Sequence, residues 1–200
     1  MNKQIVFGIS GIVVGILLTV LLVQVFSPRT TMMGYKNPIS RQSVTLSQID
    51  QHFIDQMIPH HQGAIDMANL ALKKSSRPEI IELSNNIIKA QDKEIFDMKS
   101  WYKDWFNEEV STLTSNGGMM SQGGMHMGSN NDIEILSSAK EFDKEFIEEM
   151  IPHHQMAIMM AQMLKSGTNR PEMLTLANNI IDSQTQEIIQ MQEWYSTWYE

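Results

Sequence analysis

The chain has 200 residues, with 17 methionines, six histidines and no cysteine, and its formal net charge is −8 at pH 7. This charge argues against a nucleic-acid partner, because phosphate contacts need clustered Lys and Arg side chains. The lack of cysteine excludes disulfides, iron–sulfur clusters and thiolate metal sites, so any soft ligand in this chain has to be a thioether.

The first predicted element is an apolar N-terminal segment. No charged residue occurs from Ile5 to Phe26, and a helix of this length spans roughly 30 Å of hydrocarbon. We interpret residues 1–27 as a transmembrane anchor or uncleaved signal, and residues 28–44 as a tether. A cleaved signal peptide is the alternative, although no A-x-A pattern precedes Pro28. Both interpretations place the rest outside the cytoplasm, facing the periplasm or the cell exterior.

An internal repeat organises the remainder. Residues 53–106 match residues 146–199 without a gap, at an offset of 93 (146 − 53), and about half of the aligned positions are identical. Each copy is typical of a helical hairpin, and two hairpins are expected to bury their apolar faces against each other. The sequence therefore predicts an all-α, four-helix bundle over residues 45–200. Its parts are repeat one (45–110), a Met/His/Gly-rich linker (111–131) and repeat two (132–200).

Proline and capping residues mark the predicted helix starts. The second helix of each copy begins at Pro78 or Pro171, in the favoured first position. Thr45 to Gln48 is a candidate capping box for the first helix of repeat one. Pro59 and Pro152 interrupt the first helix of each copy one residue before a histidine pair. Each either kinks its helix or begins a new one, and the sequence leaves both alternatives open.

The segment Met-Ile-Pro-His-His occurs at 57–61 and again at 150–154. Residues three and four apart share one side of a helix, so the methionine can meet both histidines. Thioether plus imidazole selects Cu(I), or its mimic Ag(I), whereas zinc and calcium favour other ligands. Histidines that only fill the core are the alternative. The second copy also adds Met159 and Met163. The predicted copper ligands of the bundle are Met57, His60, His61, Met67, Met98, Met150, His153, His154, Met156, Met160 and Met191.

The second helix of each copy carries polar residues on an otherwise apolar stripe. A carboxylate in such a place is costly unless it is paired. We interpret Glu94 and Glu187 as hydrogen-bond acceptors for ligand imidazoles or, alternatively, as direct ligands. Gln91 and Gln184, one turn earlier, are further candidate partners of an imidazole. The tryptophans of the same stripe are interpreted as core residues: Trp101, Trp105, Trp194 and Trp198.

The linker predicts a second kind of copper site. Its methionines stand among glycines, where there is no core for them to fill, so packing does not explain them. A biased, solvated loop is the alternative. The candidate ligands are Met119, Met120, Met125, His126 and Met127.

At the Met-Ile-Pro-His-His and Q-x-x-E-I-x-x-M segments the chain resembles the domain-of-unknown-function 305 family, from about residue 45 to 200. The resemblance implies a ferritin-like bundle, secreted or periplasmic, that binds copper and supports copper resistance. The ligands it implies are Met57, His60, His61, Met67, Met98, Met150, His153, His154, Met160 and Met191. The Glu-x-x-His motif of ferritin-like di-iron enzymes is missing, since Glu149 and His153 are four apart and Gln56 replaces Glu149 in the first copy.

These patterns predict an extracytoplasmic protein that sequesters or buffers Cu(I) for copper resistance or trafficking, with any delivery or export partner left open. Thioethers suit an oxidising compartment because they do not form disulfides. The alternative is a haem- or copper-dependent redox protein on the same bundle. A metal-free structural module is a third interpretation. No nucleophile with its base is recognisable, so we do not expect an enzyme.

Overall fold

The computed structural model describes residues 46–110 and 130–200, and within these ranges every regular element is an α-helix. Four helices are long and one is short: α2 (Leu46–Lys74), α3 (Pro78–Phe106), α4 (Asn130–Ser138), α5 (Phe142–Gly167) and α6 (Pro171–Tyr199). The all-α prediction is therefore confirmed for the described residues. All five helices belong to one unit, Ser43–Glu200.

Helix α4 was not predicted, and its first residues fall within the linker expected at 111–131. The helix packs onto the bundle through Leu136, which is fully buried, and through Ile133, which is half-buried against the same core cluster. Two apolar residues three positions apart in a helix of 9 residues are a weak periodic signal. Short helices of this kind depend on tertiary packing more than on their own sequence.

Proline positions explain where the long helices begin and continue. Helices α3 and α6 begin at Pro78 and Pro171, as predicted, since the first helical position needs no backbone N–H donor. Helices α2 and α5 run through Pro59 and Pro152 without a break. The alternative in which each of these two prolines begins a new helix is therefore wrong.

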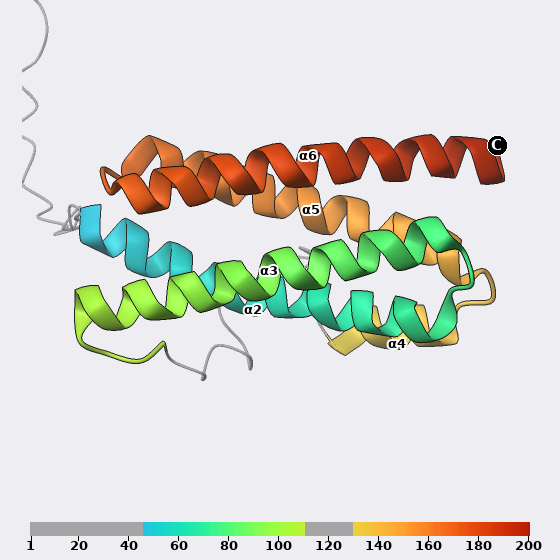
Figure 1. Ribbon diagram of the computed structural model, residues 1–200, viewed down its shortest axis with the longest axis horizontal. Helices are drawn as coiled ribbons and strands as arrows, with labels where there is room; N and C mark the ends of the chain where they lie inside the picture. Colours follow the sequence, from blue (N-terminus) through green and yellow to red (C-terminus); the bar gives the residue numbers. More distant parts are fainter. Residues whose placement is uncertain (1–45, 111–129) are drawn as a thin grey trace, which may run out of the picture. The chain divides into compact units, whose positions relative to one another are not determined.

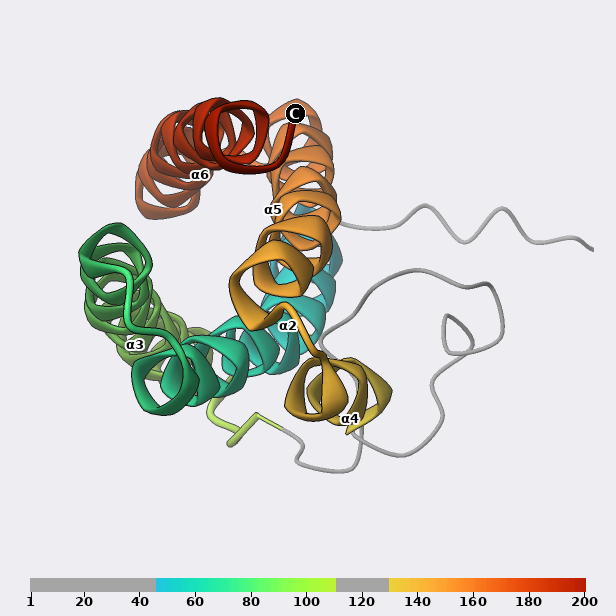
Figure 2. The same ribbon diagram turned by 90° about the vertical axis from the view of Figure 1, so that its right-hand side faces the viewer.

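The four long helices form two hairpins that meet through their first helices. Helix α2 packs against α3, α5 packs against α6, and α2 packs against α5. The order around the bundle is therefore α3, α2, α5, α6, with α3 and α6 at the two outer ends (Figures 1 and 2). Helix α4 lies beside α2 and α5.

The buried core consists of two clusters, and each contains residues of both repeats. In the first cluster, Phe53 of α2 packs with Leu164 of α5. In the second, the residues related by the repeat, Phe146 of α5 and Ala71 of α2, pack together. The clusters occupy opposite halves of α2 and α5, so neither hairpin has a closed core of its own.

Two matched ion pairs join the repeats at the ends of the bundle. Arg170, just before α6, donates its Nε–H to Asp50 of α2 at 3.0 Å. The equivalent Arg77, just before α3, lies 3.4 Å from Asp143 of α5. The Asp50 side chain is 1% exposed and that of Arg170 is 31% exposed, so the aspartate is the buried partner of this ion pair.

The tryptophans lie at the edges of the clusters and are half-buried, which differs from the core positions expected. Their rings stack in pairs within α3 and within α6, with centroids 5.7 Å and 5.5 Å apart: Trp101 with Trp105, and Trp194 with Trp198. The guanidinium of Arg170 covers Trp105 at 4.0 Å, and that of Arg77 covers Trp198 at 4.1 Å. Tryptophan at these places supports the cross-repeat ion pairs by cation–π contact.

Several predictions fall outside the described residues and stay predictions. They concern the anchor at residues 1–27, the tether at 28–44, the capping residue Thr45, and the linker ligands Met119, Met120, Met125, His126 and Met127. Among the helices that are described, none is both long and apolar enough to cross a membrane.

Candidate metal centre

Four histidines meet where α2 and α5 pack. His60 and His61 stand near the middle of α2, His153 and His154 stand near the middle of α5, and none is more than 1% exposed. The rings of His60 and His153 face each other across the two helices, with centroids 3.8 Å apart. The two Met-Ile-Pro-His-His segments are thereby joined into one buried imidazole group, which lies between the two core clusters.

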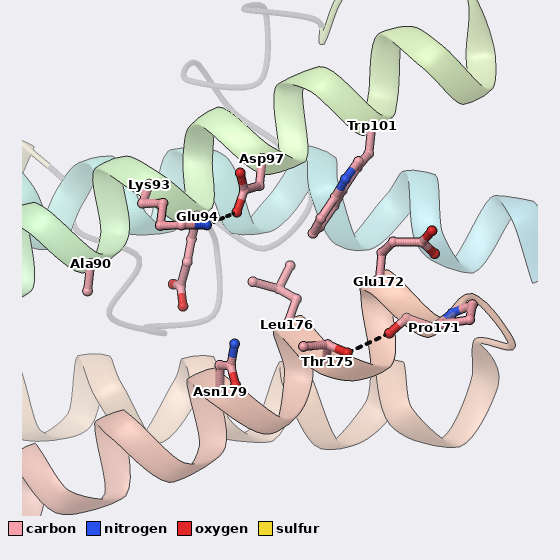
Figure 3. A pocket seen from close by; sticks show the side chains of 10 residues that line it. All are labelled: Ala90, Lys93, Glu94, Asp97, Trp101, Pro171, Glu172, Thr175, Leu176 and Asn179. Carbon is pink, nitrogen blue, oxygen red and sulfur yellow. Dashed lines mark hydrogen bonds and ion pairs between the residues drawn. The ribbon is translucent and has the colours of Figure 1, made fainter.

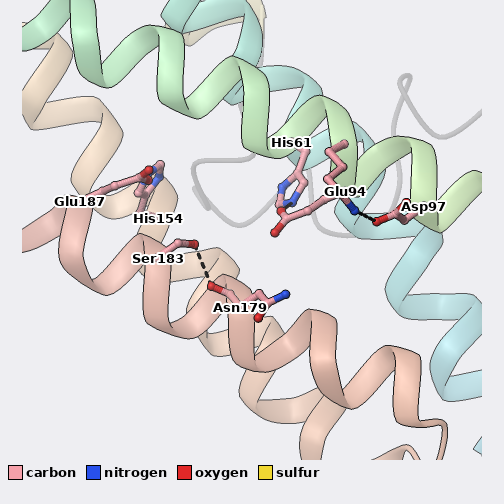
Figure 4. A network of polar contacts seen from close by, with 8 residues as sticks. His61, Glu94, Asp97, His154, Asn179, Ser183 and Glu187 are labelled. Carbon is pink, nitrogen blue, oxygen red and sulfur yellow. Dashed lines mark hydrogen bonds and ion pairs between the residues drawn. The ribbon is translucent and has the colours of Figure 1, made fainter.

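A glutamate from an outer helix contacts one histidine of each pair (Figure 4). Nε2 of His61 lies 2.7 Å from Oε2 of Glu94, and Nε2 of His154 lies 2.6 Å from Oε2 of Glu187. Because a carboxylate only accepts, Nε2 is the nitrogen that carries the proton and donates it. These contacts agree with the acceptor role predicted for the two glutamates.

The same hydrogen bonds leave Nδ1 of both rings open for another partner. Within the described residues, Nδ1 of His61 and Nδ1 of His154 are buried and have no hydrogen-bond partner. A neutral imidazole that is protonated at Nε2 has its lone pair at Nδ1. A buried polar atom without a partner costs free energy, so these two nitrogens are well placed for a metal ion. A carboxylate that fixes the imidazole tautomer is the usual companion of a metal-binding histidine.

His60 is held neutral by its surroundings. Burial, and to a smaller degree the neighbouring His61 and His154, lower the pKa of His60 from 6.5 to about 3. Both of its ring nitrogens are buried without a hydrogen-bond partner among the described residues. Since only neutral imidazole binds a metal, His60 needs to release no proton at neutral pH to become a ligand.

Predicted methionine ligands flank the histidines on both sides. One core cluster contains Met57 and Met98, with Met160 half-buried at its edge. The other cluster contains the equivalent residues of the opposite repeat: Met67, Met150 and Met191. Each cluster thus combines two predicted methionine ligands of one copy with one of the other. Within residues 46–110 and 130–200, no three His, Asp or Glu side chains lie close enough together to hold a metal ion by themselves.

Three further predicted residues are Met156, Gln91 and Gln184. Met156 is half-buried and packs against neither cluster. It follows His153 by three residues, which places the two side chains on neighbouring parts of one helical face, and its role as a ligand stays a prediction. Gln91 and Gln184 are 3% exposed, yet Oε1 of each has no hydrogen-bond partner in the described part of the chain. The predicted bond to an imidazole is therefore not formed through that atom.

A cavity of about 510 Å³ opens between α3 and α6 and reaches the carboxyl group of Glu94 (Figure 3). Glu94 therefore lines this cavity and contacts His61 at the same time. Asp97 and Glu172 line it too, and Lys93 is the basic residue in the lining, paired with Asp97. A cavity wall with more acidic than basic side chains attracts cations. Apart from Glu94, the charged residues of this lining were not predicted, because they look like ordinary solvated residues until α3 and α6 are brought together.

Residues 50–195 match the family described as "Domain of unknown function (DUF305)". The chain belongs to this family. The match includes both repeats, the four histidines of the centre and both glutamates, so the resemblance inferred from the sequence motifs is confirmed.

Proteins of known structure that are similar to this chain include CopM, which has been solved with different metal ions. The Cu(I)-bound form is 49% identical to this chain and superposes with a TM-score of 0.66, covering 76% of this chain and 98% of CopM. The Cu(II)-bound form is 51% identical, with a TM-score of 0.69 and coverages of 75% and 97%. A silver-bound form of CopM is similar to the chain as well.

More distant DUF305 members share the fold. A fragment from Deinococcus radiodurans is 24% identical, with a TM-score of 0.65, and covers 74% of this chain and 96% of its own. A protein from Streptomyces coelicolor, named as secreted, is 21% identical, with a TM-score of 0.64 and coverages of 78% and 94%.

The uncharacterized protein L153 of Acanthamoeba polyphaga mimivirus is 45% identical over 49 residues. This match spans 24% of the chain and only 32% of L153.

Proposed function

We propose that this protein is an extracytoplasmic copper-binding protein that sequesters or buffers Cu(I), and Ag(I) as its mimic, through Met/His sites. The proposal rests on Nδ1 of His61 and of His154, which are buried and have no hydrogen-bond partner among the described residues. The other nitrogen of each ring is held by a carboxylate. Both rings lie on helices that carry buried methionines, and imidazole with thioether is the donor set that selects Cu(I).

Charge balance favours a monovalent ion. Neutral imidazoles and thioethers do not compensate the charge of a bound ion, and burying an uncompensated charge is costly. Glu94 and Glu187 each bring one carboxylate within hydrogen-bond distance of a ligand imidazole. One Cu(I) ion at His61 and one at His154 would each be balanced by one carboxylate, which leaves no net charge. One Cu(II) ion at each of these histidines would leave two positive charges in total.

The likeness to CopM supports copper as the cargo. CopM is about half identical to this chain and has been solved in Cu(I)-, Cu(II)- and silver-bound forms. Those forms alone do not select an oxidation state for this chain. Our preference for Cu(I) comes from the donor atoms and from the charge balance.

We further propose that residues 1–27 anchor the chain in a membrane and that the bundle faces the periplasm or cell exterior. The charge-free run from Ile5 to Phe26 supports this location. In this proposal the protein is not an enzyme. It holds copper for resistance or trafficking, and a separate delivery or export partner takes the ion from it.

A Cu(I) competition titration of the full-length chain against a chromophoric chelator tests the copper centre. The double variant His61→Ala, His154→Ala is expected to lose the tightest binding. His52→Ala is the matched control, because His52 is an exposed histidine on the same helix as His61 and should leave the titration unchanged. Circular dichroism checks that each variant keeps its helices. A double variant that folds and binds Cu(I) as tightly as the wild type would show the proposal to be wrong.

A further inference from the structure

Three methionines that pack against neither core cluster share one strip on the surface of α5. Met156 is half-buried, Met159 is 43% exposed and Met163 is 68% exposed. At about 100° per residue, the three positions fall within an arc of about 60°. Met160, which packs at the edge of a core cluster, stands about 40° from Met156. The strip of Met156, Met159 and Met163 therefore leads from solvent toward the core.

Packing does not explain this strip. Methionine in a core fills irregular gaps, but Met159 and Met163 are exposed and Met156 packs against neither core cluster. The first repeat builds the equivalent helix without methionine at these places, where it has Gly63, Asp66 and Leu70 (offset 93). The bundle therefore does not need thioethers on this face of α5.

We propose that Met156, Met159 and Met163 form a second, solvent-facing site that holds one Cu(I) or Ag(I) ion through thioethers alone. Residues three, four and seven apart are neighbours on one helical face. The methionine side chain has three rotatable bonds, which lets three sulfur atoms converge on one ion. Thioether sulfur is the donor that suits these soft monovalent cations.

The site captures an ion at the surface and lies beside a path to the interior. Met160 adjoins the strip and belongs to the cluster that contains Met57 and Met98, the predicted ligands of the buried centre. An ion held by Met156 can therefore pass to a thioether that is already partly buried. Capture at the strip is independent of the proposed function, whereas transfer to the centre rests on it.

Silver titration of the full-length protein with ¹³C-labelled methionine methyl groups tests the site by NMR. Ag(I) is the probe because it keeps its oxidation state in air. The methyl signals of Met156, Met159 and Met163 are expected to shift together over the same equivalent of Ag(I). The triple variant M156L/M159L/M163L conserves volume and should bind one Ag(I) fewer than the wild type. M173L is the control, since Met173 is a buried methionine outside the strip and its loss should not change the stoichiometry.

Two results would overturn the proposal: a triple variant that binds as many Ag(I) ions as the wild type, or three methyl signals that shift at different silver ratios. The single variant M163L replaces the most exposed member, so it stays folded and should weaken binding at the strip at least tenfold. The H61A/H154A double variant separates this site from the buried centre. Its strip signals are expected to respond to Ag(I) as in the wild type, whether or not the buried centre binds metal.

Discussion

Acidification should destabilise the metal-free protein through His60. In the folded state burial holds the pKa of His60 at about 3, whereas the unfolded chain has the ordinary value of 6.5. Between these two values the unfolded state binds a proton that the folded state does not bind. The free energy of unfolding therefore falls as the pH falls, and this contribution of His60 is fully present only above about pH 6.5.

The two pKa values give a loss of about 2 kcal/mol between pH 7 and pH 5. The result depends little on the folded-state value, because His60 stays neutral at pH 5 for any folded pKa below about 4. Three titratable rings lie near His60, namely His61, His153 and His154. Glu94 and Glu187 contact His61 and His154. They are the same in wild type and in a His60 variant, so their contribution is largely removed by comparison.

Urea unfolding at pH 7, 6 and 5, with a chelator present, measures the effect. His60→Gln keeps a neutral polar side chain, and its free energy of unfolding should fall by about 2 kcal/mol less than that of the wild type over this range. His52→Gln, at an exposed position, should keep the pH dependence of the wild type. If His60→Gln loses as much stability as the wild type between pH 7 and 5, His60 is not a buried neutral group and the reasoning fails.

Two further predictions concern carboxylates. Glu94→Gln or Glu187→Gln should weaken Cu(I) binding about 10- to 100-fold in a competition titration, because the variant removes a balancing charge next to a ligand imidazole. Glu82→Gln, at an exposed position of α3, should leave the Cu(I) affinity unchanged. If Glu94→Gln and Glu187→Gln bind Cu(I) as tightly as Glu82→Gln, the two glutamates do not balance the charge of the ion. Asp50→Asn should lower the free energy of unfolding by about 2 kcal/mol, since it removes the buried charge that accepts a hydrogen bond from the partly exposed Arg170. The side chain of Asp143 is 19% exposed and lies 3.4 Å from Arg77, so Asp143→Asn should lower the free energy of unfolding by less. If urea unfolding gives equal losses for the two variants, burial is not the cause.

The sequence predicted the histidine pairs and their glutamates because these signals are local. Met57 and His61 are four residues apart, so any helix through them brings both to one side. Glu94 was recognised by its chemistry, because a carboxylate on an apolar stripe needs a partner. Its contact with His61 stays within one hairpin, and hairpin pairing follows directly from the repeat.

The partners of the methionines could not be predicted, because they depend on how α2 and α5 pack. Met67 shares a stripe with His60, yet it belongs to a core cluster with Met150 and Met191 of the other repeat. That arrangement results from a long-range packing contact that no local spacing encodes.

This packing also explains why the centre requires both copies of the repeat. One hairpin alone would retain the contact between His61 and Glu94 but would lose the facing ring of His153. It would also lose the half of each core cluster that the other hairpin supplies. Water would then reach His60, and the burial that lowers its pKa would be gone. The neutral, buried state that prepares these imidazoles for a soft ion is therefore a property of the paired repeats, although the Glu–His contact belongs to each repeat by itself.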